Sequence, residues 1–279
     1  MVLAAVLAQS VPWGTGESRG EDLTVTLATF GPGLDLPSWW GHSAMVVADH
    51  RLRQARLYNY GMFDFSTGFV HKFVQGRLEF WVADTEYVGG TYAEYKQLDR
   101  DVRLQVLNLT PEQAVVLAKS LADNVLPQNR EYLYHHYNDN CSTRPRDLID
   151  RAFGGALLEA TSAPARMSLR EQTRRYSQVN PPMSLVLDYL QNDELDRPIT
   201  QREEAFLPDE LERQLDLLQV TGPDGLPQPA VAERVTYFQA KDGPKTPAEP
   251  PNWNLRLLLF GAAVGAAGAL AARRERTSE

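Results

Sequence analysis

The stretch Asn138-Asp139-Asn140-Cys141-Ser142-Thr143-Arg144-Pro145-Arg146-Asp147-Leu148-Ile149 contains the only cysteine of this 279-residue chain. Apolar residues at helical spacing predict a helix that starts in this stretch and stops at Gly154-Gly155. Cys141 therefore stands at or next to the positive end of a helix, which favours the thiolate over the thiol. A lone cysteine is more often buried and inert. Its polar neighbours, Asp139, Asn140, Ser142 and Thr143, favour a reactive thiol here.

Composition limits the classes of protein to which this chain can belong. With 43% apolar residues, the chain can bury one substantial core. A net charge of −8 argues against non-specific binding to nucleic acid. The sequence contains no glycine-rich phosphate loop, no CxxC pair and no HExxH helix. We therefore expect no nucleotide, no metal and no other cofactor.

Both chain ends indicate the cell envelope. Residues 257–272 are all apolar or small, and Arg273, Arg274 and Arg276 follow. This pattern predicts a transmembrane helix over 253–272 with a cytoplasmic basic tail over 273–279. The alternative for this segment is a buried, alanine-rich core helix. At the other end, residues 1–20 are interpreted as a signal-peptide remnant or a disordered N-terminus.

Between these ends, we expect one exported domain over residues 21–220 and a linker over 221–252. Prolines, glycines and charged residues dominate the latter segment, which predicts a mostly flexible connection. The domain itself contains several successive strand patterns with helices around them, which indicates an α+β fold with an antiparallel sheet. Strands are expected at 23–27, 43–48, 52–61, 78–88 and 102–109.

Helical segments are less evenly marked than the strands. Thr110-Pro111-Glu112-Gln113 combines a capping box with a proline at the first helical position, which predicts a helix start. Further helices are expected over 184–190 and 208–218. Residues 166–182 are expected to be irregular.

A thiol nucleophile needs a base, and the base needs a group that orients it. His42, between Gly41 and Ser43, stands at the head of a predicted strand and is the best candidate base. Asn59 on the next strand could accept a hydrogen bond from the imidazole and fix its orientation. Asp64 is a competing orienting residue.

The other four histidines are weaker candidates. His50 lies in a polar turn and His71 among phenylalanines, while His135 and His136 are close to Cys141 in sequence. A zinc site of Cys141 with His42 and either His135 or His136 is a further possibility, but the ligand spacing matches no common pattern.

Four separated motifs occur in order between residues 23 and 190, and together they resemble the bacterial Lnb N-terminal periplasmic domain family. They are Trp40-Gly41-His42-Ser43-Ala44, Tyr58-Asn59-Tyr60-Gly61 with Phe63-Asp64-Phe65, Asn129-Arg130-Glu131-Tyr132, and Asp139 to Asp147. The resemblance implies a circularly permuted papain-like fold in which the histidine precedes the cysteine, as in lecithin:retinol acyltransferase-like proteins. It implies Cys141 as nucleophile, His42 as base and Asn59 as the third residue.

The resemblance also implies N-acylation of lipoproteins, in which an acyl chain moves from a phospholipid to an amine. The expected partners are thus a phospholipid or lipoprotein substrate and the membrane, with no nucleic acid. Exposed aromatic residues could reach the lipid interface, although core packing is their commoner role; they are Trp39, Trp40, Phe63, Phe65 and Phe69. Two alternatives stay open: a cysteine amidase or peptidase of the envelope, and a non-catalytic binding module.

Overall fold

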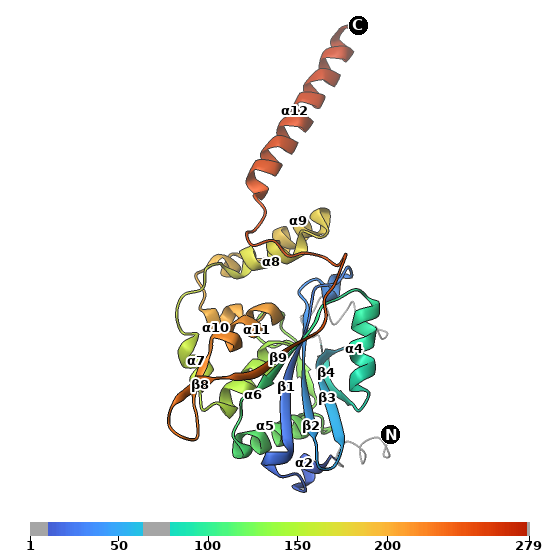
Figure 1. Cartoon of the computed structure of the whole chain (residues 1–279). Helices are drawn as coiled ribbons and strands as arrows, with labels where there is room; N and C mark the ends of the chain where they lie inside the picture. Colours follow the sequence, from blue (N-terminus) through green and yellow to red (C-terminus); the bar gives the residue numbers. More distant parts are fainter. Residues whose placement is uncertain (1–10, 64–78, 278–279) are drawn as a thin grey trace.

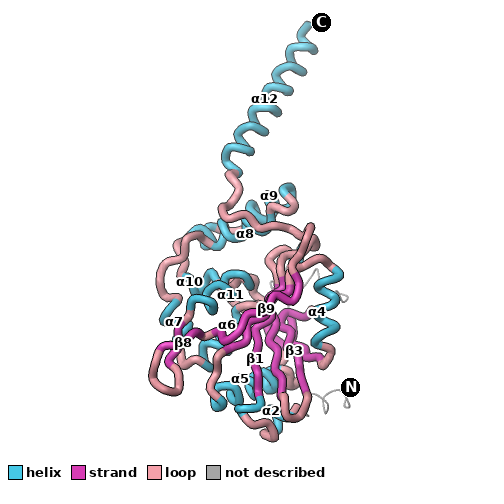
Figure 2. Tube along the Cα trace, in the orientation of Figure 1, coloured by secondary structure: helices cyan, strands magenta, loops and turns pink. Residues whose placement is uncertain are grey.

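The computed structural model describes residues 11–63 and 79–277, and its central feature is a seven-stranded antiparallel sheet (Figures 1 and 2). The strand order is β6-β4-β3-β2-β1-β5-β9. The strands are β1 (Leu23–Phe30), β2 (His42–Asp49), β3 (Gln54–Met62), β4 (Glu79–Thr85), β5 (Val102–Leu107), β6 (Glu131–Leu133) and β9 (Val231–Phe238). A separate two-stranded ribbon joins β7 (Gln219–Thr221) to β8 (Pro227–Pro229). The expected α+β class with an antiparallel sheet is confirmed.

Helices surround this sheet. They are α2 (Pro12–Thr15), α4 (Val88–Gln97), α5 (Pro111–Asn124), α6 (Thr143–Ala152), α7 (Ala156–Ala160), α8 (Leu169–Ser177), α9 (Pro181–Leu190), α10 (Gln201–Glu204), α11 (Pro208–Leu217) and α12 (Trp253–Thr277). Short 3-10 turns add η1 (Gly20–Asp22), η2 (Leu36–Ser38) and η3 (Asp193–Asp196). The predicted capping box of α5 is present, with Thr110 and Gln113 each bonding the other's backbone.

Both faces of the sheet are covered because successive residues of a strand point to opposite sides. Met45 and Val47 of β2 pack in the main core, which α5, α6 and α11 complete. Ala44 and Val46 face the other side, where they meet α4. Figure 2 shows these helices on either side of the strands. The sheet is therefore buried on two sides, and its strand ends are the places where polar side chains can gather.

The pairing of β1, β2 and β3 sets the position of the candidate base. His42 is the first residue of β2 and lies opposite Phe30, the last residue of β1. Gly41, just before it, has a left-handed φ of 77°, which a side chain would strain. Ala44 lies opposite Asn59 on β3, so His42 and Asn59 are diagonal neighbours on one face.

Four sequence-based expectations need correction. The linker prediction is wrong for residues 231–238, because β9 pairs with β5 along its length. Residues 11–20 are not a disordered remnant, since Val11 and Trp13 are only 2% exposed. The expected strand over 78–88 ends at Thr85, and a helix, α4, follows. The supposedly irregular stretch over 166–182 contains α8, which starts with a capping box of Ser168 and Glu171. Residues 1–10 lie outside the described part of the chain.

The C-terminal segment forms α12, which projects away from the sheet domain in Figure 1. Across residues 11–63 and 79–277, no helix combines the length and the apolar character needed to cross a membrane. The expected transmembrane helix over 253–272 is thus not supported.

Candidate active site

Asn140 holds the loop that carries Cys141. Its side-chain Oδ1 accepts hydrogen bonds from the backbone N–H groups of Ser142 (2.8 Å) and Thr143 (2.9 Å), where α6 begins. Its Nδ2 donates to the carbonyl oxygens of His136 (2.6 Å) and Phe206 (3.0 Å). Cys141 therefore stands immediately before the cap of α6, as the sequence indicated, on a loop that is fixed at both ends.

The polar neighbours of Cys141 have a different role from the one that the sequence suggested. Ser142 donates to the Ala205 carbonyl (2.8 Å), and Thr143 accepts from the backbone N–H of Asn140 (2.8 Å). Asp139 pairs with Arg144. These side chains build the loop rather than face a ligand, so they are weaker evidence for a reactive thiol than we expected.

His42 and Asn59 meet as predicted. The imidazole Nε2 of His42 lies 2.5 Å from Oδ1 of Asn59. Because an amide oxygen only accepts, Nε2 carries the proton in this arrangement and Nδ1 of the neutral ring is left with a free lone pair. The ring also stacks at 6.1 Å from Phe30 and at 6.4 Å from Tyr95 of α4. Asp64, the competing orienting residue, lies outside the described residues.

The thiol of Cys141 lies at the head of β2. The backbone N–H groups of Ser43, the residue after His42, and of Cys141 itself lie near the Cys141 thiol and lower its pKa. The Cys141 Cβ also lies beside Gly61 of β3, 3.7 Å from the point that a Cβ would occupy there. The fold thus brings Cys141 to the strand ends that carry His42 and Asn59.

Burial sets the resting protonation of both groups. It raises the pKa of the Cys141 thiol to about 11, against the lowering effect of the two backbone N–H groups and of Arg100. Burial also lowers the pKa of His42 to about 4, although the hydrogen bond to Asn59 works in the other direction. Near pH 7 the pair is therefore a neutral thiol beside a neutral imidazole, and the imidazole is free to accept a proton.

Two side chains that the sequence analysis did not select complete the surroundings of the thiol. The buried hydroxyl of Tyr132 on β6 has no hydrogen-bond partner in the described part of the chain and lies 3.9 Å from the same point beside Gly61. Arg100, buried between α4 and β5, lowers the pKa of both Cys141 and His42 through its charge. Tyr132 is the last residue of the quoted motif Asn129-Arg130-Glu131-Tyr132, whereas no local signal marks Arg100.

The remaining histidines are engaged elsewhere. His50 meets the Thr24 hydroxyl at 2.7 Å, and His135 forms an isolated bridge with Asp139. His136 packs at 4.5 Å against the Trp40 ring. His71 is outside the described residues. In the part of the chain that the structure describes, no group of three or more His, Cys, Asp or Glu side chains could hold a metal ion, so the zinc alternative gains no support.

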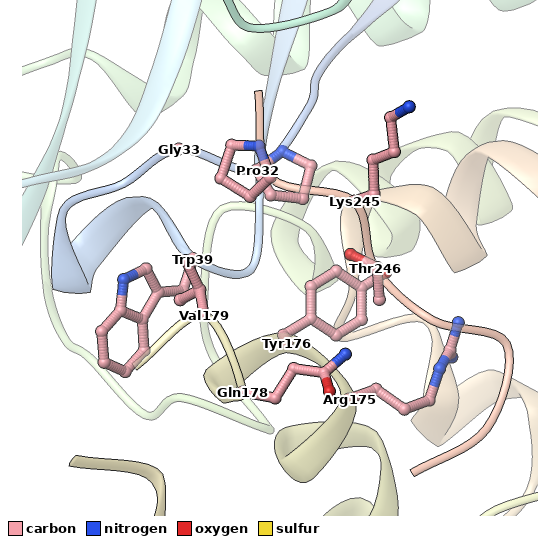
Figure 3. A pocket seen from close by; sticks show the side chains of 10 residues that line it. Pro32, Gly33, Trp39, Arg175, Tyr176, Gln178, Val179, Lys245 and Thr246 are labelled. Carbon is pink, nitrogen blue, oxygen red and sulfur yellow. The ribbon is translucent and has the colours of Figure 1, made fainter. Parts of the chain in front are cut away.

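A pocket of about 240 Å³ lies beside the loop that leads into His42 (Figure 3). Its walls come from the 32–39 loop, from the junction of α8 and α9 and from residues 244–246. Trp39 lines this pocket but is only 4% exposed, and its indole N–H donates to the Leu34 carbonyl (3.0 Å). Trp39 is therefore a packing residue rather than an interfacial one. Phe63 packs on Phe80, while Phe65 and Phe69 lie outside the described residues.

The site combines a thiol, a histidine and an amide at the strand ends of an antiparallel sheet. A family model, the Lnb N-terminal periplasmic domain, matches residues 9–175. The chain belongs to this family, and its matched part is a periplasmic domain of the cell envelope. Comparisons with curated proteins and with solved structures found no match.

Proposed function

We propose that this chain is a thiol acyltransferase that moves an acyl chain from a phospholipid to an amine of an envelope acceptor, such as the N-terminus of a lipoprotein. One observation carries the proposal: the backbone N–H of Ser43 acts on the Cys141 thiol, next to a histidine that Asn59 orients. A thiol, an oriented base and backbone donors are the parts that acyl transfer through a thioester requires. The permuted papain-like fold is part of the same proposal.

In the first step, Nδ1 of His42 takes the thiol proton while the Cys141 sulfur attacks the ester carbonyl carbon. The negative charge moves to the carbonyl oxygen of a tetrahedral intermediate. Collapse of the intermediate breaks the ester C–O bond, and the imidazolium returns its proton to the departing alkoxide. The products are a lysophospholipid and a thioester on Cys141.

The negative charge of this intermediate needs donors that are already in place. The backbone N–H of Cys141 and the Tyr132 hydroxyl are suited to this role, because both lie at the thiol and the hydroxyl has no acceptor among the residues that the structure describes. The ring of Tyr132 has the Arg144 guanidinium carbon 3.6 Å from its centroid. That cation withdraws electron density and makes the hydroxyl a better donor.

The second step transfers the acyl group to the acceptor. An amine attacks the thioester carbonyl, His42 accepts the ammonium proton and then returns it to the departing Cys141 sulfur. The product is an amide, and the resting thiol is restored. Water in place of the amine would give a free fatty acid, which is the hydrolase alternative.

Exposed apolar side chains near the pocket favour a lipid donor. Leu34, beside pocket residue Gly33, is 76% exposed, and α9, which follows pocket residue Val179, exposes Tyr189 at 88%. Solvent-exposed apolar residues that gather at one place mark contact with a partner or a lipid. The others there are Leu36, Met183, Val186 and Leu190. In Figure 1, α9 lies at the end of the domain from which α12 projects.

The proposal is tested with the full-length protein in mixed micelles of detergent and phospholipid, with a diacylated lipopeptide as amine acceptor. We expect lysophospholipid to be released and the lipopeptide to gain one acyl chain by mass spectrometry. We also expect a hydroxylamine-sensitive acyl adduct on Cys141. Cys141→Ala and His42→Ala should each lower turnover by at least about 10³-fold, because nucleophile and base act as a unit.

His50→Ala is the matched control, because this histidine also lies near a strand end but its imidazole contacts the exposed Thr24 hydroxyl. It should leave turnover unchanged. Release of free fatty acid with no acylated lipopeptide would show that the protein is a hydrolase rather than a transferase. No adduct on Cys141, together with full activity of Cys141→Ala, would reject the thiol mechanism altogether.

A further inference from the structure

Arg100 is a buried cation without a counter-charge. It is only 7% exposed and stands in the turn between α4 and β5. Its Nε donates to the Gly31 carbonyl (2.8 Å), while its Nη2 is buried and has no hydrogen-bond partner within residues 11–63 and 79–277. Among the described residues, no carboxylate lies within ion-pair distance of it. An unpaired buried charge costs several kcal/mol, on the order of the penalty for desolvating one ion.

Contacts link this guanidinium to the thiol–histidine site. Its central carbon lies 4.7 Å from the ring centroid of Tyr95, and the same ring stacks on Phe30 at 3.7 Å and lies 6.4 Å from the His42 ring. The Cys141 thiol lies next to these rings, because the backbone of Ser43, the residue after His42, acts on it and lowers its pKa. Arg100 therefore lies against the aromatic rings that pack beside His42, and its burial limits the screening of its charge by solvent.

We propose that Arg100 is the fixed counter-charge of the Cys141 thiolate, a positioning residue that stabilises negative charge at the sulfur without touching the substrate. The proposal rests on the role of Cys141 as nucleophile given above. The thiol is neutral at rest, so the cation stands unpaired until the proton leaves. The thiolate then supplies the missing negative charge.

The charge of Arg100 acts on both members of the pair. It lowers the pKa of Cys141, which favours the thiolate, and it lowers the pKa of His42, which keeps the imidazole neutral and able to accept a proton. The tyrosines around the sulfur stay neutral, since burial raises the pKa of Tyr95 to about 12 and those of Tyr132 and Tyr134 further, so they neither add to nor offset the charge of Arg100.

Other charged groups are less suited to this task. Arg144 of α6 is paired with Asp139 and lies over the Tyr132 ring. The carboxylate that acts on Arg100 itself is Asp35, which stands on an exposed loop and raises the pKa of the guanidinium. Asp35 therefore opposes part of the positive potential that Arg100 creates, and its removal should act in the direction opposite to removal of Arg100.

The test is the rate of Cys141 alkylation by iodoacetamide between pH 7.5 and 9.5, which needs no substrate. Arg100→Met should slow alkylation about tenfold at every pH in this range, because a rise of one pKa unit lowers the thiolate fraction tenfold. Arg100→Lys retains the charge and should stay within about threefold of the wild type. Asp35→Asn should alkylate faster than the wild type.

A purely structural role for Arg100 would lower the stability of both arginine variants without changing the pH profile of the folded fraction. Alkylation of folded Arg100→Met at the wild-type rate would overturn the inference. If that variant does not fold, an unchanged rate in Asp35→Asn would overturn it instead. Failure of the proposed function would be seen separately. In that case His42→Ala is alkylated at the same rate as the wild-type protein, and the wild-type protein transfers no acyl group.

Discussion

At the scale of single residues, the candidate site depends on which imidazole nitrogen carries the proton. Asn59 decides this, because its Oδ1 accepts from Nε2 of His42 and leaves Nδ1 as the base. An amide is neutral, so it orients the ring without adding charge, and burial keeps the pKa of His42 at about 4. A neutral orienting group thus suits a base that must stay unprotonated over a wide pH range.

Replacement of Asn59 by Asp adds a negative charge at the same place. A carboxylate favours the imidazolium, so we expect the pKa of His42 to rise from about 4, measured by NMR titration of its ring protons. Asn59→Ala should instead lower the alkylation rate about tenfold at pH 8, since it frees the ring. An unchanged His42 pKa in Asn59→Asp would show that Asn59 does not bind His42 in solution.

At the scale of elements, the C-terminal chain is attached to the sheet more firmly than its composition suggested. β9 adds a strand beside β5, and Asp99 then holds the residues beyond it. The carboxylate of Asp99 accepts the backbone N–H groups of Lys241 (3.0 Å) and Asp242 (2.7 Å), and these bonds lower its pKa. Asp99 has a φ of 51°, a left-handed conformation that aspartate tolerates better than most residues.

Loss of this carboxylate should release the segment that follows β9. We expect Asp99→Ala to increase the rate of tryptic cleavage after Lys241 several-fold, because an unbonded segment reaches the protease more often. The matched control is Asp123→Ala, which removes an exposed carboxylate that pairs with Lys119 within α5. Equal cleavage rates after Lys241 in the two variants would show that the Asp99 carboxylate does not hold this segment.

At the scale of the whole molecule, two partly buried histidines couple stability to pH. Burial lowers the pKa of both His42 and His136 from 6.5 to about 4. The unfolded chain therefore binds more protons than the folded chain between these two values. By linkage, the free energy of unfolding should fall as the pH drops from 6.5 towards 4 and should depend little on these groups above 6.5.

Urea unfolding at pH 7 and pH 5 measures this coupling. We expect the wild type to lose stability at pH 5, and His136→Asn to lose less over the same interval, because asparagine does not titrate. The comparison uses each variant's own value at pH 7, so any packing cost of the substitution cancels. An identical loss in the wild type and in His136→Asn would show that the pKa of His136 is the same in the folded and the unfolded chain.

The sequence by itself determined the local features of this protein, because they arise from short-range periodicity and capping. Alternation predicted most strands of the sheet, the Thr110 capping box predicted α5, and the motifs selected Cys141, His42 and Asn59 before any contact was known. The sequence also predicted a polar loop around Cys141, although the side chains of this loop fix the backbone at the start of α6.

Only the tertiary structure decided which distant segments meet. Trp13 donates to the Tyr58 hydroxyl (2.7 Å), and this contact brings a presumed disordered end into the core. β9 pairs with β5 although more than a hundred residues separate them in the sequence. Arg100 lies near the thiol site because it follows α4, a helix that no sequence motif predicted. Such contacts depend on how the entire core packs rather than on any local pattern, since each partner alone is an ordinary tryptophan, strand or arginine.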